Sequence, residues 1–157
     1  MSKPLAEGDV APAFSLPGDG GAAISLAGFK GRSIALFFYP KDDTSGCTQE
    51  AQDFTALIDD FDRAGCIVLG VSPDPLKKHA KFKDKHNLKM NLLSDEAKTT
   101  LEAYGVWQEK SMYGRKYMGV ERSTFLIGKD GRIAKLWRKV KVPGHAAEVL
   151  ASAKALS

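Results

Sequence analysis

The stretch Ser33-Ile-Ala-Leu-Phe-Phe-Tyr39 carries most of the information about the fold. Six of its seven residues are apolar, and no polar residue alternates with them. Gly31 and Pro40 bound the run. A continuous apolar run of this length is typical of a strand that is buried on both faces of a sheet. We therefore expect this stretch to be the central strand of an α/β domain.

The residues after this strand have the spacing of an amphipathic helix. A polar loop, 41–46, is followed by apolar side chains three and four residues apart, which are Ala51, Phe54, Leu57, Ile58 and Phe61. This spacing predicts one helix that begins near Cys47 and ends at Gly65. Residues 66–72 form a second apolar strand, so a right-handed β-α-β crossover is expected.

The rest of the chain continues this pattern. Helices are predicted at 75–86, 96–104 and 144–156, the last with Val149, Leu150 and Leu156 facing inward. Further strands are predicted at 91–93, 122–127 and 133–138, with an Asp-Gly turn between the last two, and edge strands or loops near 14–16 and 23–26. We expect a single domain over residues 1–157, of the α/β class, in which a central mixed β-sheet is flanked by helices on both faces.

Composition narrows the functions that the chain can have. With 2 cysteines in 157 residues, a disulfide-built scaffold and a four-cysteine zinc site are excluded. The net charge of +4 comes largely from one stretch, whose basic residues are Lys77, Lys78, Lys81, Lys83, Lys85 and Lys89. We interpret this stretch as a solvated helix face and expect no specific nucleic-acid partner.

No apolar run is long enough for a signal peptide or a membrane span, so we expect a cytoplasmic protein with no membrane partner. The three histidines, His79, His86 and His145, lack a metal-binding spacing and are predicted to lie at the surface. We expect neither a metal nor a cofactor.

Cys47 lies where the loop after the central strand becomes a helix. In open α/β sheets, chemistry is found at the carboxyl ends of the strands. A helix start offers unpaired N–H groups and a partial positive charge, and both favour a thiolate over a thiol. The position therefore indicates a reactive nucleophile, although an inert buried cysteine would fit it equally well.

The residues around Cys47 form a recognisable motif. Pro40-Lys-Asp-Asp-Thr-Ser-Gly-Cys47 fits the pattern Pro-x-x-x-Thr-x-x-Cys. The chain resembles the peroxiredoxins, and among them the bacterioferritin-comigratory-protein group. Similar stretches follow in family order, at 38–51, 68–72, 92–96, 104–107 and 122–127. The resemblance implies a thioredoxin-like fold and a thiol-dependent peroxidase.

The resemblance also implies roles for particular residues. Cys47 would be the nucleophile that attacks the peroxide and becomes a sulfenic acid. The Thr44 hydroxyl would bond the sulfur and the peroxide, Pro40 would shield the sulfur, and Arg122 would supply forked donors and permanent charge. The substrate pocket would include Gly46, Glu50, Tyr39 and Trp107. Glu50 could orient the arginine or only complement the helix dipole, while core packing would equally explain the two aromatic residues.

The second cysteine departs from the family pattern. Many members of the group carry a resolving cysteine five or thirty-six residues after the first, and here those positions are Gln52 and Lys83. Cys66 lies beyond the helix that Cys47 begins, which would be about 25 Å long, whereas a disulfide needs Cα atoms within about 7 Å. We therefore interpret Cys66 as structural and expect a one-cysteine cycle, completed by an external thiol such as thioredoxin, glutaredoxin or glutathione. A Cys47–Cys66 disulfide formed after local helix unfolding is the alternative.

Three other functions compete with this interpretation. A dithiol exchanger would need a Cys-x-x-Cys pair, and Glu50 stands at the second position. A non-catalytic, basic nucleic-acid-binding protein would use the lysine-rich helix. An inactive relative would be expected to lack part of the set Pro40, Thr44, Cys47 and Arg122, which is intact here. We expect a monomer that acts on hydrogen peroxide and organic hydroperoxides.

Overall fold

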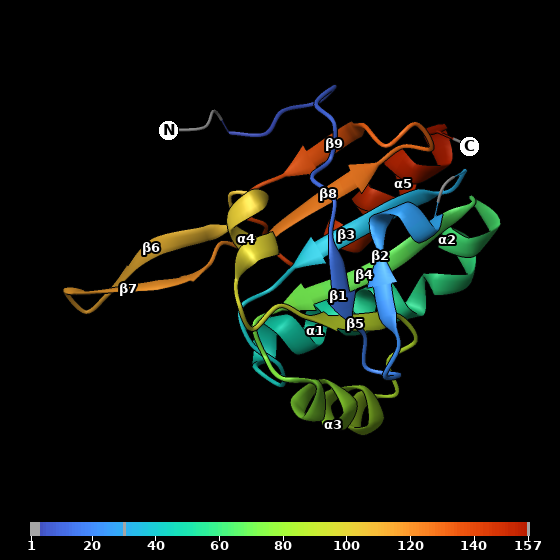
Figure 1. The fold of residues 1–157 in the computed structure, drawn as a ribbon. Coiled ribbons are helices and arrows are strands. Elements are labelled where there is room, and N and C mark those ends of the chain that lie inside the picture. The colour runs from blue at the N-terminus through green and yellow to red at the C-terminus, as the bar shows by residue number, and fades with distance from the viewer. Residues whose placement is uncertain (1–3, 30, 157) are drawn as a thin grey trace.

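The computed structural model describes residues 4–29 and 31–156, and a five-stranded sheet lies at its centre (Figure 1). In spatial order the strands are β5 (Asn91–Ser94), β4 (Cys66–Ser72), β3 (Ser33–Phe38), β8 (Ser123–Ile127) and β9 (Ile133–Trp137). β3, β4 and β5 run parallel, whereas β8 is antiparallel to β3 and β9. All six residues of β3 are buried. This strand is central, as the apolar run predicts.

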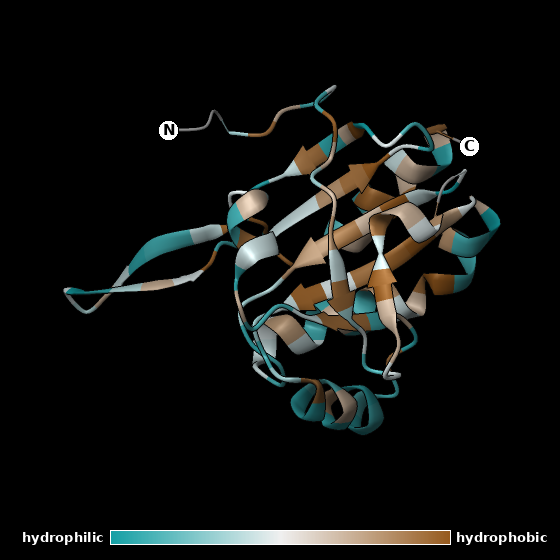
Figure 2. Ribbon diagram, in the orientation of Figure 1, coloured by the Kyte–Doolittle hydropathy of each residue, from teal (hydrophilic) through white to brown (hydrophobic). Residues whose placement is uncertain are grey.

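Two apolar layers cover the sheet. One contains side chains of α1 (Ser45–Ala56), α2 (Ile58–Arg63) and α5 (His145–Leu156), with Phe82 from α3 (Leu76–His86). On the other lie the N-terminal pair β1 (Ser15–Pro17) and β2 (Ala23–Ser25), the 3-10 helix η1 (Leu26–Phe29) and the short α4 (Thr99–Ala103). Figure 2 shows the hydrophobic colour concentrated on the sheet strands between these layers. The mixed α/β sheet with flanking helices is confirmed.

The helix that begins near Cys47 is interrupted, which corrects the prediction of one helix. α1 ends at Ala56 and α2 starts at Ile58, because Leu57 between them leaves the helical conformation with φ −105° and ψ 7°. The apolar stripe continues through this break, so periodicity alone did not reveal it. The helix predicted at 96–104 is also shorter in the structure, where α4 spans Thr99–Ala103.

A long β-hairpin projects from the body of the molecule and was not predicted (Figure 1). Its strands are β6 (Trp107–Met112) and β7 (Arg115–Val120), which pair antiparallel along their full length. The turn contains Tyr113 and Gly114, both with positive φ. The segment lacks a continuous apolar run because most of its side chains are exposed. We call this hairpin the arm.

Three side chains do not lie where the sequence predicts them. Leu156 is 41% exposed rather than inward-facing, since it is the last residue of α5. His79 is completely buried and His145 is 4% exposed, which corrects their prediction as surface residues. Each has a buried oxygen partner from another element, Asp42 for His79 and Thr124 for His145. Those pairings depend on the tertiary fold and leave no local signal in the sequence.

Several lysines of the basic stretch form ion pairs with acidic residues elsewhere in the fold instead of facing only solvent. Lys83 lies 2.9 Å from Asp19, Lys85 lies 2.8 Å from Asp43, and Lys78 lies 3.9 Å from Asp74. The basic stretch is therefore partly neutralised by acidic residues of the fold. None of the described helices is both long enough and apolar enough to cross a membrane.

Candidate active site

Cys47 is the third residue of α1, and its side chain is buried with 1% exposure. The loop after β3 leads to Thr44, the N-cap, whose backbone is extended. The first hydrogen bond of the helix runs from the Thr48 N–H to the Thr44 carbonyl at 2.8 Å. The N–H groups of Gly46 and Cys47 precede this bond and so have no helical acceptor. The thiol therefore lies at the positive end of α1.

Arg122 is the cation at the Cys47 thiol. Its Nη2 donates to Cys47 Sγ at 3.4 Å, and its Nη1 donates to Glu50 Oε1 at 2.7 Å. Residue 122 directly precedes β8, where Ser123 pairs with Phe38 at the end of β3. This register brings the guanidinium to the start of α1 although 75 residues separate it from Cys47. Burial acts to lower the pKa of Arg122, but the charges of Glu50 and Cys47 outweigh it and raise that pKa.

Glu50 lies one helical turn after Cys47, on the same side of α1. It is 1% exposed, so its carboxyl group has lost nearly all contact with water. Burial raises the pKa of Glu50 to about 7, against the opposing effect of Arg122. Its Oε2 has no hydrogen-bond partner among the described residues. Of the two roles left open for Glu50, the geometry favours orientation of the arginine.

Gly46 allows the guanidinium to approach the helix closely. A Cβ atom at this position would lie 3.1 Å from Arg122 Nη2, which is closer than most side-chain contacts. Any larger residue would push the guanidinium away from the first turn of α1. The close approach of Arg122 thus explains why a glycine precedes Cys47 in the motif.

The other predicted site residues are Thr44, Pro40, Tyr39 and Trp107. The Thr44 hydroxyl donates to the Lys41 carbonyl at 2.8 Å, within the loop. Pro40 follows β3 and is half-buried. Tyr39 is fully buried and engages Asp42, while Trp107 lies at the start of the arm with the Lys98 ammonium 5.4 Å from its ring centre. The structure thus places Arg122 against Cys47, Glu50 and Gly46. The Thr44 hydroxyl donates to a backbone carbonyl instead of the expected Cys47 sulfur, and Tyr39 and Trp107 contact other residues.

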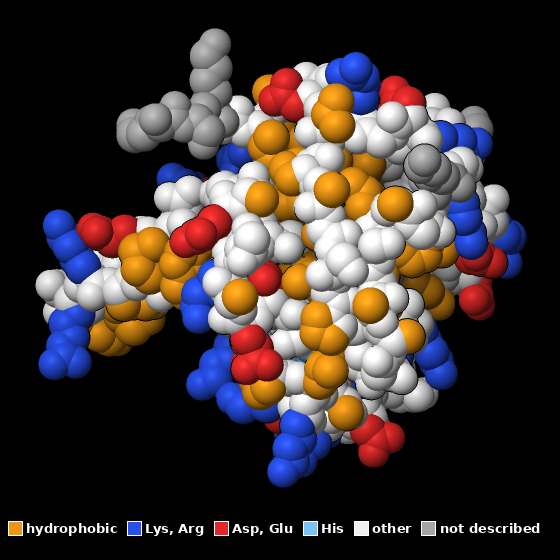
Figure 3. All heavy atoms as spheres, viewed as in Figure 1, with side chains coloured by type: hydrophobic (Ala, Val, Ile, Leu, Met, Phe, Trp, Pro, Cys, Tyr) orange, Lys and Arg blue, Asp and Glu red, His pale blue; other side chains and the backbone are white. Residues whose placement is uncertain are grey.

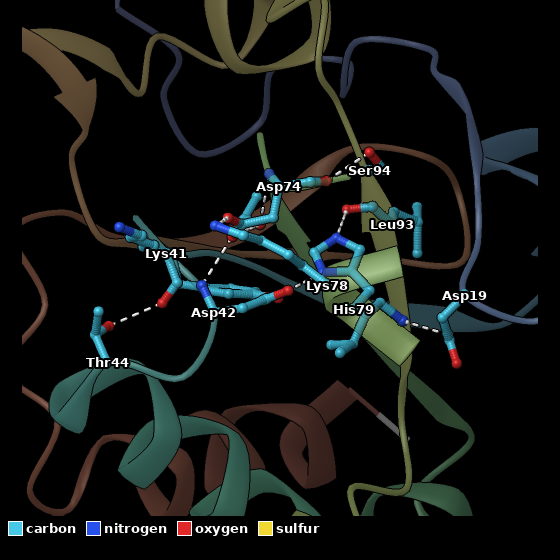
Figure 4. Close-up of polar contacts among 12 residues, drawn as sticks. Asp19, Lys41, Asp42, Thr44, Asp74, Lys78, His79, Leu93 and Ser94 are labelled. Atoms are coloured by element: carbon cyan, nitrogen blue, oxygen red, sulfur yellow. Dashed lines mark hydrogen bonds and ion pairs between the residues drawn. The ribbon is translucent and has the colours of Figure 1, made fainter. Parts of the chain in front are cut away.

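A buried polar network fixes the loop between β3 and α1 (Figure 4). Asp42 accepts a hydrogen bond from the Tyr39 hydroxyl at 2.6 Å, and its other oxygen lies 2.6 Å from His79 Nδ1. His79 Nε2 faces the Leu93 carbonyl at 2.9 Å, so this nitrogen carries a proton. The short Nδ1–carboxylate contact requires a second proton between the two groups. Burial acts to lower the pKa of His79, but Asp42 and the Leu93 carbonyl outweigh it and raise that pKa.

Asp74 completes this network from the end of β4. Its Oδ2 accepts hydrogen bonds from the backbone N–H of Asp42 at 2.8 Å and from the Ser72 hydroxyl at 2.7 Å. The ligand atoms of Asp42, Asp74 and His79 lie within 4.8 Å of one another, a separation that would suit a metal ion. A cation there would have to displace N–H and O–H donors that these atoms already bind. These hydrogen bonds hold the loop between β3 and α1 in place.

The next loop residue, Asp43, is held from outside by the same helix. Lys85 and His86 of α3 each donate to its carboxylate at 2.8 Å. These two hydrogen bonds lower the pKa of Asp43. The backbone of Asp43 has a positive φ of 62°, which is uncommon for a residue other than glycine. α3 therefore contacts the loop between β3 and α1 at two successive residues, Asp42 and Asp43.

Cys66 lies at the opposite end of the central strands from Cys47. It is the first residue of β4, pairs with Ser33 at the start of β3, and is 2% exposed. Burial raises the pKa of its thiol. Six strand residues span about 20 Å, and Cys47 follows the far end of β3. Both cysteines are free in the structure.

Such a thiol, set at a helix start beside an arginine on a mixed α/β sheet, defines a class of thiol-based redox enzymes. Comparison with known proteins gives the family. Residues 8–136 match the model of the AhpC/TSA family, and the chain belongs to that family. Within it the chain is a peroxiredoxin, a thiol-dependent peroxidase, as the resemblance in sequence indicates.

The similar proteins cover nearly the whole chain. Peroxiredoxin Bcp of Bacillus subtilis is 50% identical over 150 residues, which are 96% of each chain. Peroxiredoxin Bcp of Escherichia coli is 42% identical over 142 residues, 90% of this chain and 91% of that one. Solved peroxiredoxin Q of Xanthomonas campestris superimposes with a TM-score of 0.87 at 45% identity, covering 90% of both chains. The thioredoxin-like fold is therefore confirmed.

Proposed function

We propose that this chain reduces peroxides through Cys47 and is returned to the thiol by an external thiol. The observation that carries the proposal is the position of Arg122, with one nitrogen 3.4 Å from Cys47 Sγ and another held by buried Glu50. The forked guanidinium can then serve both the sulfur and an oxygen bound next to it. The attack of Cys47 on the peroxide uses only side chains and backbone N–H groups of this chain.

The reaction follows from this geometry. The Cys47 thiolate attacks one peroxide oxygen, the S–O bond forms, and the O–O bond breaks. The other oxygen leaves as an alkoxide or hydroxide and takes up a proton, while Cys47 becomes a sulfenic acid. Arg122 and the N–H groups of Gly46 and Cys47 stabilise the negative charge that develops on the oxygens. Thr44 and Pro40 bound the approach to the sulfur.

We propose both hydrogen peroxide and organic hydroperoxides as substrates. A structure of the bacterioferritin comigratory protein of Xanthomonas campestris, which is 44% identical to this chain, is described in terms of alkyl peroxide reduction. Of the aromatic pocket residues proposed here, Trp107 would contact the organic part of such a substrate, whereas Tyr39 is fully buried and its hydroxyl is bonded to Asp42.

The proposed cycle uses a single cysteine. Residues 52 and 83 are Gln and Lys, so neither usual resolving position holds a thiol. Cys66 is buried, has a raised pKa that disfavours the thiolate, and lies level with the first residue of β3, at the opposite end of that strand from Cys47. Thioredoxin, glutaredoxin or glutathione would supply the second thiol. We also propose that the protein works as a monomer in the cytoplasm.

Peroxide consumption by three forms of the protein tests this function. With dithiothreitol as the reductant, Cys47→Ser should fall to the background rate because the attacking sulfur is gone. Cys66→Ser is the matched control, and it should keep at least half of the wild-type rate. Equal rates for wild type and Cys47→Ser would remove the peroxidase assignment of Cys47.

A further inference from the structure

The arm carries most of the large hydrophobic side chains that are exposed among the described residues. Six large hydrophobic side chains are exposed among residues 4–29 and 31–156, and four of them lie on the arm. They are Met112, Tyr113, Tyr117 and Met118, with exposures of 56%, 98%, 43% and 50%. Figure 3 shows hydrophobic side chains in orange along the arm, with Lys and Arg side chains in blue among them. An exposed apolar cluster of this kind commonly marks an interaction site.

The two faces of the arm differ in charge. Residues that pair across an antiparallel ladder share a face, so Lys110 lies beside Tyr117 and Met112 beside Arg115. We call these four residues the arm face. The opposite face carries Met118 and the ion pair between Glu109 and Lys116 at 3.6 Å, the only ion pair within the described arm. The arm face thus presents two unneutralised cations around two apolar side chains.

The arm face begins at the active site. β7 ends at Val120, two residues before Arg122. Lys110 packs over Gly119, where a Cβ atom would lie 3.2 Å from its Cδ. Burial and the charge of Arg122 lower the pKa of Lys110, while negative charge at Cys47 and Glu121 opposes that effect, so the ammonium group lies within electrostatic reach of all three residues. A molecule bound along this face would therefore end next to Cys47.

We propose that the arm face docks the protein that reduces oxidised Cys47, and that this partner is a dithiol protein with an acidic contact surface. The proposal rests on the external-thiol cycle proposed above. Charge complementarity selects an acidic partner, because the face holds Lys110 and Arg115 and no carboxylate. Cys47 is 1% exposed, so a protein thiol has to be held beside the pocket to react with its sulfur.

The electrons balance across two exchanges. A thiolate of the partner attacks the sulfur of the Cys47 sulfenic acid, an S–S bond forms, and the S–O bond breaks with release of water after protonation. The second thiolate of the partner then attacks the partner's own sulfur in this mixed disulfide. The Cys47 thiolate leaves, and the partner keeps both oxidised sulfurs as its disulfide.

Other occupants fit the face less well. A second copy of this chain would bring two positively charged faces together, and like charges repel. Membrane or nucleic-acid surfaces are recognised by larger basic clusters, about four to eight cations in polybasic membrane segments. Docking beside Cys47 is useful only to a partner that reacts with the Cys47 sulfur.

Matched variants of the two faces of the arm test the proposal. The first is Met112→Ser/Arg115→Gln/Tyr117→Ser, which removes the apolar contacts and one cation of the arm face. The second is Lys116→Gln/Met118→Ser, which removes one cation and one apolar side chain from the opposite face of the same hairpin. Turnover is measured with an acidic thioredoxin, with an acidic glutaredoxin, and with dithiothreitol.

For the better of the two protein reductants, kcat/KM should fall at least tenfold in the first variant and stay within twofold in the second. Dithiothreitol-supported turnover should be unchanged in both variants, because neither alters the residues that bind peroxide. For wild type, kcat/KM for the protein reductant should fall as ionic strength rises, because salt screens the two cations. The single substitution Arg115→Glu should reproduce part of the loss without removing any apolar contact.

Several outcomes would overturn the docking proposal. One is that wild type turns over with dithiothreitol but with neither protein reductant. Another is that kcat/KM for the protein reductant falls equally in the two variants. A third is that this kcat/KM does not depend on salt. A concentration-dependent dimer that only the first variant abolishes, with thioredoxin kinetics intact, would make the face a self-association surface. Failure of wild type with dithiothreitol would instead contradict the peroxidase function itself.

Discussion

At the scale of single residues, the ion pair between Arg122 and Glu50 decides how the site is built. The carboxylate is buried at 1% exposure and bonds the guanidinium through one oxygen, while its other oxygen has no partner among the described residues. Breaking a buried pair by removing one charge is usually costly. The arrangement therefore holds Arg122 in one orientation toward Cys47, at the expense of stability when Glu50 is ionised.

The variant Glu50→Gln should reveal that cost through its pH dependence. The pKa of Glu50 is raised to about 7 in the folded protein, so the folded state binds a proton that the unfolded state has already released. Stability attributable to this residue should fall as pH rises from about 4.5 to about 7 and stay constant above. Relative to wild type, Glu50→Gln should gain up to about 3 kcal/mol over that range.

Urea unfolding at pH 5 and pH 8 measures this difference. Asp59→Asn, at an exposed acidic residue of α2, serves as the control and should show little change between the two pH values. A stability difference between Glu50→Gln and wild type that is independent of pH would show that Glu50 has an ordinary pKa in the folded state.

At the scale of elements, α3 fixes the catalytic loop. His79 reaches Asp42 inside the protein, and Lys85 and His86 reach Asp43 at the surface. The inner contact is between fully desolvated groups, whereas Asp43 is 44% exposed, so the two contacts should differ greatly in strength. The helix that was predicted as a solvated basic face has a positioning role for the loop.

A double-mutant cycle on Asp42 and His79 should detect this role. His79→Gln should cost about 3 kcal/mol of unfolding free energy, because it leaves the Asp42 carboxylate buried without its cation. Adding Asp42→Asn should recover part of that loss, since no uncompensated charge remains. Lys85→Gln, which changes only the exposed contact to Asp43, should cost much less, because exposed ion pairs contribute little to stability. Strictly additive losses for Asp42→Asn and His79→Gln would contradict the proposed coupling.

The elements that the sequence predicted well are those with a continuous apolar pattern. β3, β4, β8 and α3 lie within a residue or two of their expected positions. The break at Leu57 was missed because the apolar stripe continues through it. The arm was missed because its strands are not buried and so do not need an apolar run.

At the scale of the whole molecule, the site combines residues that the chain alone could suggest only in part. Cys47, Thr44 and Pro40 share one motif, and Arg122 could be assigned only through the family resemblance. The pairing of Phe38 with Ser123 supplies the physical reason why Arg122 reaches Cys47. The buried network of Asp42, Asp74 and His79 required the tertiary fold, because Asp42 meets partners that lie 32 and 37 residues further along the chain.

The whole fold also separates the two thiols. Cys47 is at the carboxyl end of the central strands, and Cys66 is level with the first residue of β3. Bringing their sulfurs together would require α1 and α2 to unravel, with loss of the packing around Phe54 and Phe61. The distance, more than the reactivity of either cysteine, therefore favours an external thiol.

The mass and thiol content of wild-type protein after one equivalent of peroxide test the one-cysteine cycle most directly. We predict a product in which Cys47 is trapped as a sulfenic acid by a dimedone-type reagent, while Cys66 still reacts as a free thiol once the protein is unfolded. An intramolecular Cys47–Cys66 disulfide as the main product, reversible by dithiothreitol, would contradict that cycle.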